Sequence, residues 1–309
     1  MLTALLIMTR VVHIAASILI AGTFTFQIVT LGSTGSSLGD DLRGIERDLS
    51  RLAVWSLIAV LLSAVLWFSL EIINMSGLPV ASVFSATAWR TVLFETQFGR
   101  VWQLRLGLVA LALALIAPGL ARDEARRARM FILWLLSVVL LVSLAWISHA
   151  AAARVQPLGL FGDALHLCAA GVWIGGLAPL AIFLAHMPVF SSDKKVVLVL
   201  ERFSTLSLGC VSVLIVSGIS NSWLLVGSIH ALFTTPYGRL LLVKLALFGI
   251  LIGVGARNRL TIKTKLLRAQ TSSNLLPQLR RNVICEICLG AVVIAIVACL
   301  GVTPPAGHP

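Results

Sequence analysis

Charged residues are scarce in this chain, and long apolar runs are frequent. Only 12% of its 309 residues are Asp, Glu, Lys or Arg, whereas 59% are hydrophobic. Soluble domains contain about 25% charged and about 45–50% apolar residues. The shortage of charge excludes a water-soluble fold, because so few polar side chains cannot cover such an apolar chain in water.

Signature motifs of several enzyme classes are also missing. The sequence contains no G-x-x-x-x-G-K-[ST] phosphate loop, no Asp-Lys-Thr-Gly phosphorylation motif and no H-E-x-x-H zinc motif. ATP-driven pumping and zinc-dependent hydrolysis therefore lack their usual residues, and we predict a protein that is not an enzyme. The five cysteines lie in or beside apolar stretches without a loop framework, which argues against structural disulfides.

Eight apolar stretches are long enough to cross a bilayer. A spanning helix needs about 20 mostly apolar residues, because the hydrocarbon core is about 30 Å thick and offers no water to backbone groups. The first stretch lacks a basic region before it and is too long for a signal peptide, so we expect it to be retained. We predict an all-α integral membrane protein with spans near residues 5–30, 52–73, 101–120, 130–148, 158–185, 204–226, 240–256 and 283–302.

The basic residues between these stretches indicate an orientation. Alternate loops hold 17 Lys and Arg residues, and the other set holds only four. Because cytoplasmic loops are enriched in Lys and Arg, we expect both termini on the non-cytoplasmic side of the membrane. The net charge of +12 then follows from membrane orientation, and no nucleic-acid partner is predicted.

Two halves of the chain resemble each other weakly. His13 and His166 open similar segments, and each is followed nine residues later by a glycine, Gly22 or Gly175. Four spans return the chain to its starting side, so we expect two parallel four-helix repeats, 1–150 and 151–309, within one membrane domain. The third and seventh stretches share an aromatic residue, Gly, Arg and an intramembrane base at equal spacing: Phe98-Gly99-Arg100 with Arg105, and Tyr237-Gly238-Arg239 with Lys244.

A few polar side chains fall inside the apolar stretches, where they are costly and indicate function. His13 and His166 are predicted to lie inside the membrane, near its outer face. His149 follows the end of the fourth stretch at the same face. Imidazole groups on an outward face suit the capture of copper, zinc, iron or nickel. The alternative is that each histidine is structural and bonds a backbone carbonyl. Arg105 and Lys244 either act directly or extend to the membrane edge.

The second half carries a combination of motifs that resembles the copper resistance protein D family, and length and helix count extend the resemblance to the whole chain. The matching segments are Asp163-Ala164-Leu165-His166-Leu167, Gly171-Val172-Trp173-Ile174-Gly175-Gly176, Arg202-Phe203-Ser204, Val216-Ser217-Gly218 with Asn221, Trp223-Leu224-Leu225-Val226-Gly227-Ser228, and Thr235-Pro236-Tyr237-Gly238-Arg239 with Leu242-Val243-Lys244.

This resemblance implies an inner-membrane protein of bacterial copper handling that acts with a small periplasmic copper-binding protein of the CopC type. We therefore interpret the chain as a copper transporter whose outer histidines capture the ion, with the direction of transport left open. One alternative is a b-type haem electron carrier, because paired intramembrane histidines on a helical bundle also hold haem. Another is a membrane scaffold for the periplasmic carrier that does not itself transport.

The repeat also suggests a geometry for the metal site. We expect His13 and His166 to approach each other near the repeat axis and to form, with His149, one copper site in the outer half of the membrane. Asp163 lies one turn before His166. It is expected either to hold the imidazole in place as an outer acceptor or to pair with Arg10.

Overall fold

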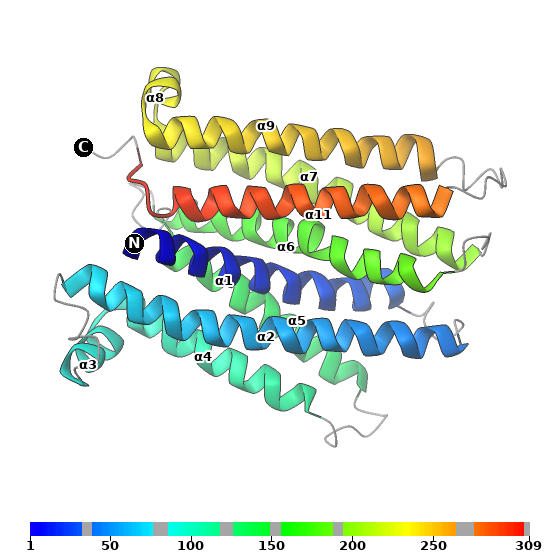
Figure 1. Ribbon diagram of the computed structural model, residues 1–309, viewed down its shortest axis with the longest axis horizontal. Helices are drawn as coiled ribbons and strands as arrows, with labels where there is room; N and C mark the ends of the chain where they lie inside the picture. Colours follow the sequence, from blue (N-terminus) through cyan, green and yellow to red (C-terminus); the bar gives the residue numbers. More distant parts are fainter. Residues whose placement is uncertain are drawn as a thin grey trace.

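The computed structural model describes residues 1–32, 39–76, 86–117, 126–148, 156–187, 194–263 and 275–305. Regular structure within these ranges is entirely helical (Figure 1). The elements in chain order are α1 (Leu2–Thr25) with its π-helical extension η1 (Phe26–Leu31), α2 (Gly39–Ser76), α3 (Ala86–Glu95), α4 (Gln97–Ile116), α5 (Arg126–Val142) with the 3-10 turn η5 (Ser143–Ile147), α6 (Gln156–His186), α7 (Lys194–Val226), α8 (Ile229–Thr234), α9 (Pro236–Arg257) with the π-helical turn η7 (Asn258–Lys263), and α11 (Leu275–Leu300).

Eight of these helices are long and apolar enough to cross a membrane, which confirms the predicted fold class. Three spans begin eight or nine residues earlier than the apolar pattern predicts, at Arg43, Val196 and Leu275 instead of near residues 52, 204 and 283. A helix satisfies its own backbone hydrogen bonds, so it continues from the bilayer into the polar segment beyond. Hydropathy marks the buried part of such a helix and not its end.

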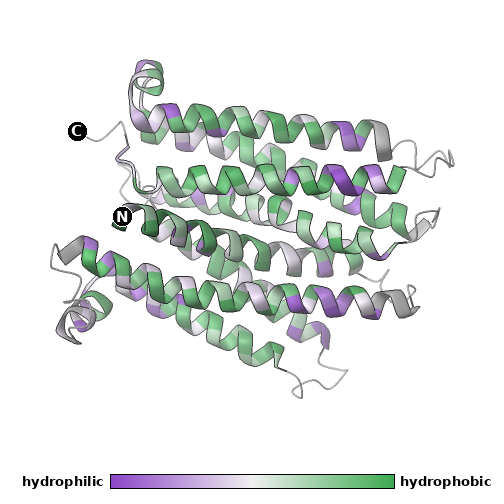
Figure 2. Ribbon diagram, viewed as in Figure 1, coloured by the Kyte–Doolittle hydropathy of each residue, from purple (hydrophilic) through white to green (hydrophobic). Residues whose placement is uncertain are grey.

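The long helices run side by side, and both termini lie at one end of the bundle together with α3 and α8 (Figure 1). Hydrophilic residues gather toward the opposite end of the long helices (Figure 2). This is the end where the sequence places its basic loops. The assignment of that end to the cytoplasm rests on the charge count and stays a prediction.

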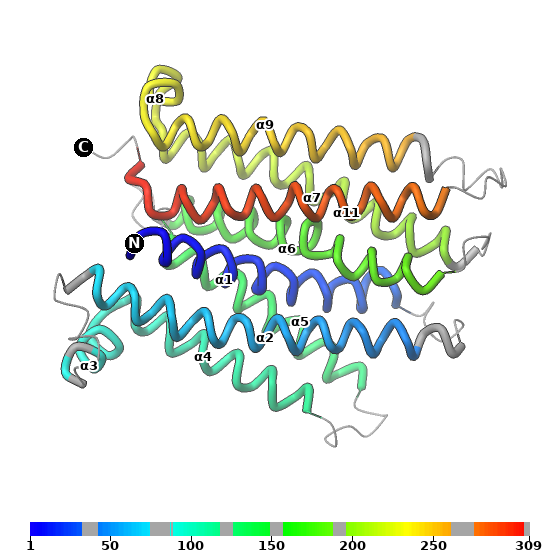
Figure 3. The backbone as a smooth tube through the Cα atoms, viewed as in Figure 1, coloured from blue at the N-terminus to red at the C-terminus, as the bar shows by residue number. Residues whose placement is uncertain are grey.

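Helices α1 and α6 lie together in the interior of the bundle (Figure 3). They meet at the two glycines that the repeat singled out. A Cβ atom added to Gly22 would clash with the backbone of Gly175, and one added to Gly175 would clash with the carbonyl of Ile18. Two backbones approach this closely only where side chains are absent, as is common between membrane helices. Gly22 and Gly175 therefore allow the close approach of α1 and α6, one of the contacts between the two halves.

The turns that precede α4 and α9 have the same construction. A short helix, α3 or α8, is followed directly by a threonine that caps the next helix. The hydroxyl of Thr96 accepts from the amide of Gly99 at 2.9 Å, and that of Thr235 accepts from the amide of Gly238 at 3.0 Å. Both turns carry the aromatic-Gly-Arg motif on which the predicted repeat was based.

Large apolar side chains cover the outside of the bundle. Trp55, Val216 and Trp223 are among the most exposed of them. Such a surface would promote aggregation in water, but it suits contact with lipid tails. Cys285 and Cys288 are exposed on α11, and we do not assign them to a site.

Candidate functional site

His13 is fully buried in α1 and uses both of its ring nitrogens. Nδ1 lies 2.9 Å from the hydroxyl of Ser63 on α2. That hydroxyl donates its own proton to the carbonyl of Ala59 at 2.5 Å, so it accepts from an Nδ1–H of His13. The guanidinium of Arg105 on α4 donates to Nε2 at 2.6 Å. The imidazole is therefore neutral, and its free electron pair on Nε2 is already engaged.

Arg105 does not extend to the membrane edge, because it is 1% exposed. Besides His13, it donates to the carbonyl of Leu140 at 2.6 Å, the hydroxyl of Ser143 at 2.5 Å and that of Ser17 at 3.3 Å. Within the described ranges no acidic side chain forms an ion pair with it. A buried cation is tolerated only when polar groups surround it, and here neutral acceptors do so. We call this group, with Ser63, the His13 cluster.

Indole rings enclose the His13 cluster. Trp67 and Trp102 pack edge-on against the imidazole, with ring centroids 5.4 and 5.1 Å away. The guanidinium of Arg10, one turn before His13, lies 4.6 Å from the centroid of the Trp67 ring. Both indoles are almost completely buried. The imidazole of His13 is thus shielded from solvent and flanked by the cations Arg10 and Arg105, which is unfavourable for an approaching metal ion.

His166 of α6 makes the same hydrogen bond in the second half but leaves one nitrogen free. Its Nδ1 lies 2.9 Å from the hydroxyl of Ser217 on α7, which donates to the carbonyl of Val213 at 2.6 Å. His166 therefore carries its proton on Nδ1 and presents an electron pair on Nε2. No side chain in the described part of the chain hydrogen-bonds to this Nε2.

A carboxylate lies one turn before His166. The Asp163 side chain accepts from the hydroxyl of Ser148 at 2.7 Å and, at 3.5 Å, from the amide of Asn221 on α7. Lys244 on α9 is close enough to interact electrostatically with both Asp163 and His166. These side chains and Ser217 make up the His166 cluster. It differs from the His13 cluster in having an acidic group and an unoccupied imidazole nitrogen.

The predicted site residues are therefore distributed over two places. The hydrogen bonds direct His13 toward α2 and α4 and His166 toward α7, so the structure does not bring the two rings onto one ion. The reason is helical geometry. Nine residues are about two and a half turns, so a histidine nine residues before an interface glycine faces away from that interface.

His149 lies outside the described residues. The residue before it, Ser148, donates to Asp163, so the chain enters this segment directly beside the His166 cluster. Among the described residues no three His, Cys, Asp or Glu side chains form a group that could hold a metal. Asp163 bonds Ser148 and Asn221 in place of the expected partners, His166 or Arg10.

The sequence interpretation missed the two serines that orient the imidazoles. Ser63 and Ser217 are single hydroxyls in apolar helices, and nothing in the local pattern separates them from serines that only bond their own backbone. The distance along the chain was the available signal: Ser63 follows His13 by 50 residues, and Ser217 follows His166 by 51. A repeat comparison that began from the histidines would have paired them.

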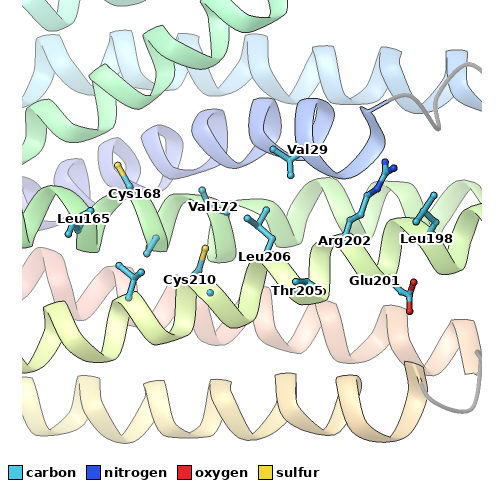
Figure 4. Close-up of a pocket in the computed structure, with 13 residues that line it drawn as sticks. Val29, Leu165, Cys168, Val172, Leu198, Glu201, Arg202, Thr205, Leu206 and Cys210 are labelled. Atoms are coloured by element: carbon cyan, nitrogen blue, oxygen red, sulfur yellow. The ribbon is translucent and has the colours of Figure 1, made fainter.

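A separate groove of about 880 Å³ opens on the outside of the second half, between η1, α6 and α7 (Figure 4). Its wall is largely apolar, with Cys168 and Cys210 along its length and Glu201 and Arg202 toward one end. His166 is not part of the lining. Residues two apart on a helix lie on different faces, so Cys168 and His166 face different sides of α6.

Comparisons with known proteins agree with the motifs of the second half. The family model described as "Copper resistance protein D-like, N-terminal domain" matches residues 1–156, and "Copper resistance protein D" matches residues 197–300. The chain is 30% identical to "Copper transport protein CutJ" of Bacillus subtilis (strain 168) over 67% of its own length and 38% of that protein. It therefore spans well under half of that relative.

Two further relatives match over more of their length. The chain is 30% identical to "Inner membrane protein YebZ" of Escherichia coli (strain K12) over 82% of each chain. It is 28% identical to "Copper resistance protein D" of Pseudomonas syringae pv. tomato over 68% of this chain and 70% of that one. No solved structure matches. The two family models and the extent of the match to YebZ place this multi-pass membrane protein in the copper resistance protein D family.

Proposed function

We propose that this protein transports copper ions across the bacterial inner membrane and that the His166 cluster captures the ion on the periplasmic side. The observation that carries the proposal is the state of the His166 ring. Its Nδ1–H is held by Ser217, its Nε2 has no hydrogen-bond partner among the described side chains, and the carboxyl group of Asp163 lies one turn earlier on the same helix. Metal-binding histidines typically have one nitrogen held by an outer partner and the other on the metal.

The ligand types in and near this cluster suit copper. Imidazole nitrogen binds copper well, and a carboxylate oxygen from Asp163 adds negative charge close by. His149 directly follows Ser148, which is tied to Asp163. We include His149 as the further ligand, so that His149 and His166 bind the ion and Asp163 balances its charge.

His13 has a different part in this proposal. Its Nε2 accepts from Arg105 in the present arrangement, so it binds copper only after the guanidinium has moved away. We assign it to a later step of transport, after capture at the His166 cluster. Two successive sites fit a transporter better than one shared site, because an ion must leave each position that it enters.

The orientation and the partner are part of the same proposal. With 17 basic residues in one set of loops and four in the other, the end that carries both termini, α3 and α8 faces the periplasm. A CopC-type copper carrier would dock on this end, over the loops between the second and third, fourth and fifth, and sixth and seventh spans. Reporter fusions test the orientation: a periplasmic reporter that is active near Lys263 contradicts it, and so do crosslinks from the carrier to the basic loops.

Copper flux into proteoliposomes tests the function itself. Wild-type protein should load the vesicles with copper, and His166→Ala should not, although it inserts normally. His230→Ala is the matched control, because His230 is exposed on α8 at the same end. Carrier binding without copper flux in the wild type would favour the scaffold alternative.

The haem alternative has less support from the geometry. A bis-histidine haem needs a free electron pair from each axial imidazole on facing helices. His13 and His166 point into separate clusters, and Nε2 of His13 accepts from Arg105. A Soret band in the absorption spectrum of the purified protein would overturn this argument.

A further inference from the structure

A second buried polar group lies in the other half of the membrane, and neither the capture site nor the family match accounts for it. Glu286 of α11 is 3% exposed. One of its carboxyl oxygens accepts from the side-chain amide of Asn258 at 2.6 Å, and the carbonyl of that amide accepts from the amide of Asn282 at 2.7 Å. The two amides thus form a directed chain of donors that ends on one carboxyl group.

No cation neutralises Glu286 among the described residues. From α9 it faces Gly255, and from α6 it faces Trp173: a Cβ atom placed on Gly255 would lie 3.8 Å from Oε2 of Glu286 and 4.0 Å from the indole. The guanidinium of Arg259 on η7 donates instead to the carbonyl and hydroxyl of Ser204 on α7, at 2.9 and 2.7 Å.

The remaining charged side chains of the packed elements point elsewhere. Arg257, Arg280 and Arg281 are exposed, and Arg10 of α1 lies against Gly301 at the other end of α11. An ionised Glu286 would therefore be an unpaired charge at membrane depth. Such a group is retained where it binds or moves an ion.

The Glu286 group lies below the capture site in the same half of the molecule. Trp173 follows His166 by seven residues, which is about two turns and brings it to the same side of α6. Its ring packs against Phe248 of α9, with centroids 6.1 Å apart, and Phe248 is one turn after Lys244. The order along the membrane is thus the His166 cluster, an aromatic pair and then Glu286.

The surroundings of Glu286 are poorly suited to binding a metal ion. The oxygen of Asn258 is occupied by Asn282, and its nitrogen points at the carboxyl, so neither is free to coordinate. One carboxyl oxygen against an apolar wall provides a single acceptor, whereas a bound metal needs several. A proton needs only one.

We propose that Glu286 is a proton-exchanging carboxyl that couples copper transport to the proton gradient, with Asn258 and Asn282 as its positioning residues. This inference rests on the proposed transport function. In each cycle Oε2 takes up a proton from one side of the membrane and releases it to the other, and no other bond is made or broken. Asn258 begins a π-helical turn at the end of α9, a feature that is frequent at functional positions in helices.

The test uses the full-length protein in vesicles that contain a pH-sensitive dye. Wild-type copper flux should respond to an imposed pH difference and should move protons. Glu286→Gln keeps an oxygen for Asn258 but cannot exchange a proton, so it should lose both the response and the proton movement while it still binds copper. Glu95→Gln changes an exposed glutamate on α3 and should behave as wild type. Proton-coupled flux of wild-type size in Glu286→Gln would overturn the proposal.

A second measurement separates this inference from the transport function. If the wild type moves no copper at all, the proposed function fails, and the infrared spectrum of the purified protein still tests Glu286. A pH titration should show the carbonyl stretch of a protonated carboxylic acid in the wild type and in Glu95→Gln, and its loss in Glu286→Gln. Identical titrations of all three proteins would contradict a proton-exchanging Glu286.

Discussion

The two halves of this protein contain the same hydrogen bond in opposite settings. In each half an imidazole Nδ1 lies 2.9 Å from a serine hydroxyl on the next spanning helix. In the first half the other ring nitrogen of His13 accepts from a buried guanidinium, and in the second half that of His166 is free. The same hydrogen bond can therefore belong to a closed cluster or to an open one, depending on what meets Nε2.

The charged residue one turn before each histidine also differs between the two halves. Arg10 precedes His13 and lies over an indole, whereas Asp163 precedes His166 and accepts hydrogen bonds from neutral groups. A cation at that position disfavours a metal ion on the adjacent ring, and a carboxylate favours it. The two halves thus differ in the residue one turn before the histidine and in the partner of its Nε2. The serine that bonds Nδ1 is the same in both.

Removal of each imidazole is expected to give the largest contrast between the halves. His166→Ala should weaken copper binding by more than about 100-fold, because losing even an outer partner of a metal ligand costs about 10–100-fold. His13→Ala should bind copper with near wild-type affinity but transport it slowly. Isothermal titration with copper measures the first effect, and vesicle flux measures the second. Equal loss of binding in both variants would mean that the halves share one site.

The contact between the halves should be sensitive to a single added methyl group. Gly22→Ala and Gly175→Ala each place a Cβ against the backbone of the opposite helix, and such overpacking costs about 1–3 kcal/mol. Gly107→Ala and Gly249→Ala are matched controls, because a Cβ at either position meets no atom of another helix within 4 Å. Thermal unfolding in detergent compares the four variants. Equal midpoints for all of them would show that α1 and α6 can separate at no cost.

The sequence was sufficient to predict the fold class, the number of spans and the family. Those properties depend on composition and on local patterns, which hydropathy and motifs record directly. The positions of Gly22 and Gly175 in the sequence also contained information about the site. Their nine-residue distance from His13 and His166 implies that a histidine and a glycine of one helix face opposite ways, so the glycines can meet only if the rings diverge.

Contacts between side chains from distant helices were not predictable in this way. Arg105 was expected to be as suited to the membrane edge as to a direct role, and only the positions of α1, α4 and α5 show that acceptors surround it. In the sequence, Glu286 is a single acidic residue near the start of the last apolar stretch. Its significance depends on Asn258, 28 residues away, and on the absence of a nearby cation among the described residues.

Replacing the serine that bonds each histidine should change copper affinity less than replacing the histidine itself. Ser217→Ala leaves the Nδ1–H of His166 without its acceptor, so the ring is no longer held for the metal and copper affinity should fall by about 10–100-fold. Ser63→Ala makes the same change at His13. The electron pair on Nε2 of His13 already accepts from Arg105, so copper affinity should not change. Competition with a copper-binding dye measures both affinities. A fall of similar size in Ser63→Ala would mean that His13 binds copper at the capture step.

The smallest expected effect is also the most specific test of why the halves differ. If Arg105 is what closes His13, then Arg105→Leu frees Nε2, and the variant should bind an additional, weaker copper equivalent that disappears when His13→Ala is added. Lys244→Leu is the counterpart in the second half, where the imidazole nitrogen is already free. It should raise the affinity of the existing site without adding an equivalent, because a positive charge near His166 and Asp163 is removed. Copper analysis of the purified variants, checked for folding by their unfolding midpoints, distinguishes these outcomes. A folded Arg105→Leu protein with wild-type copper content would show that the indole walls of Trp67 and Trp102, and not the guanidinium, keep metal away from His13.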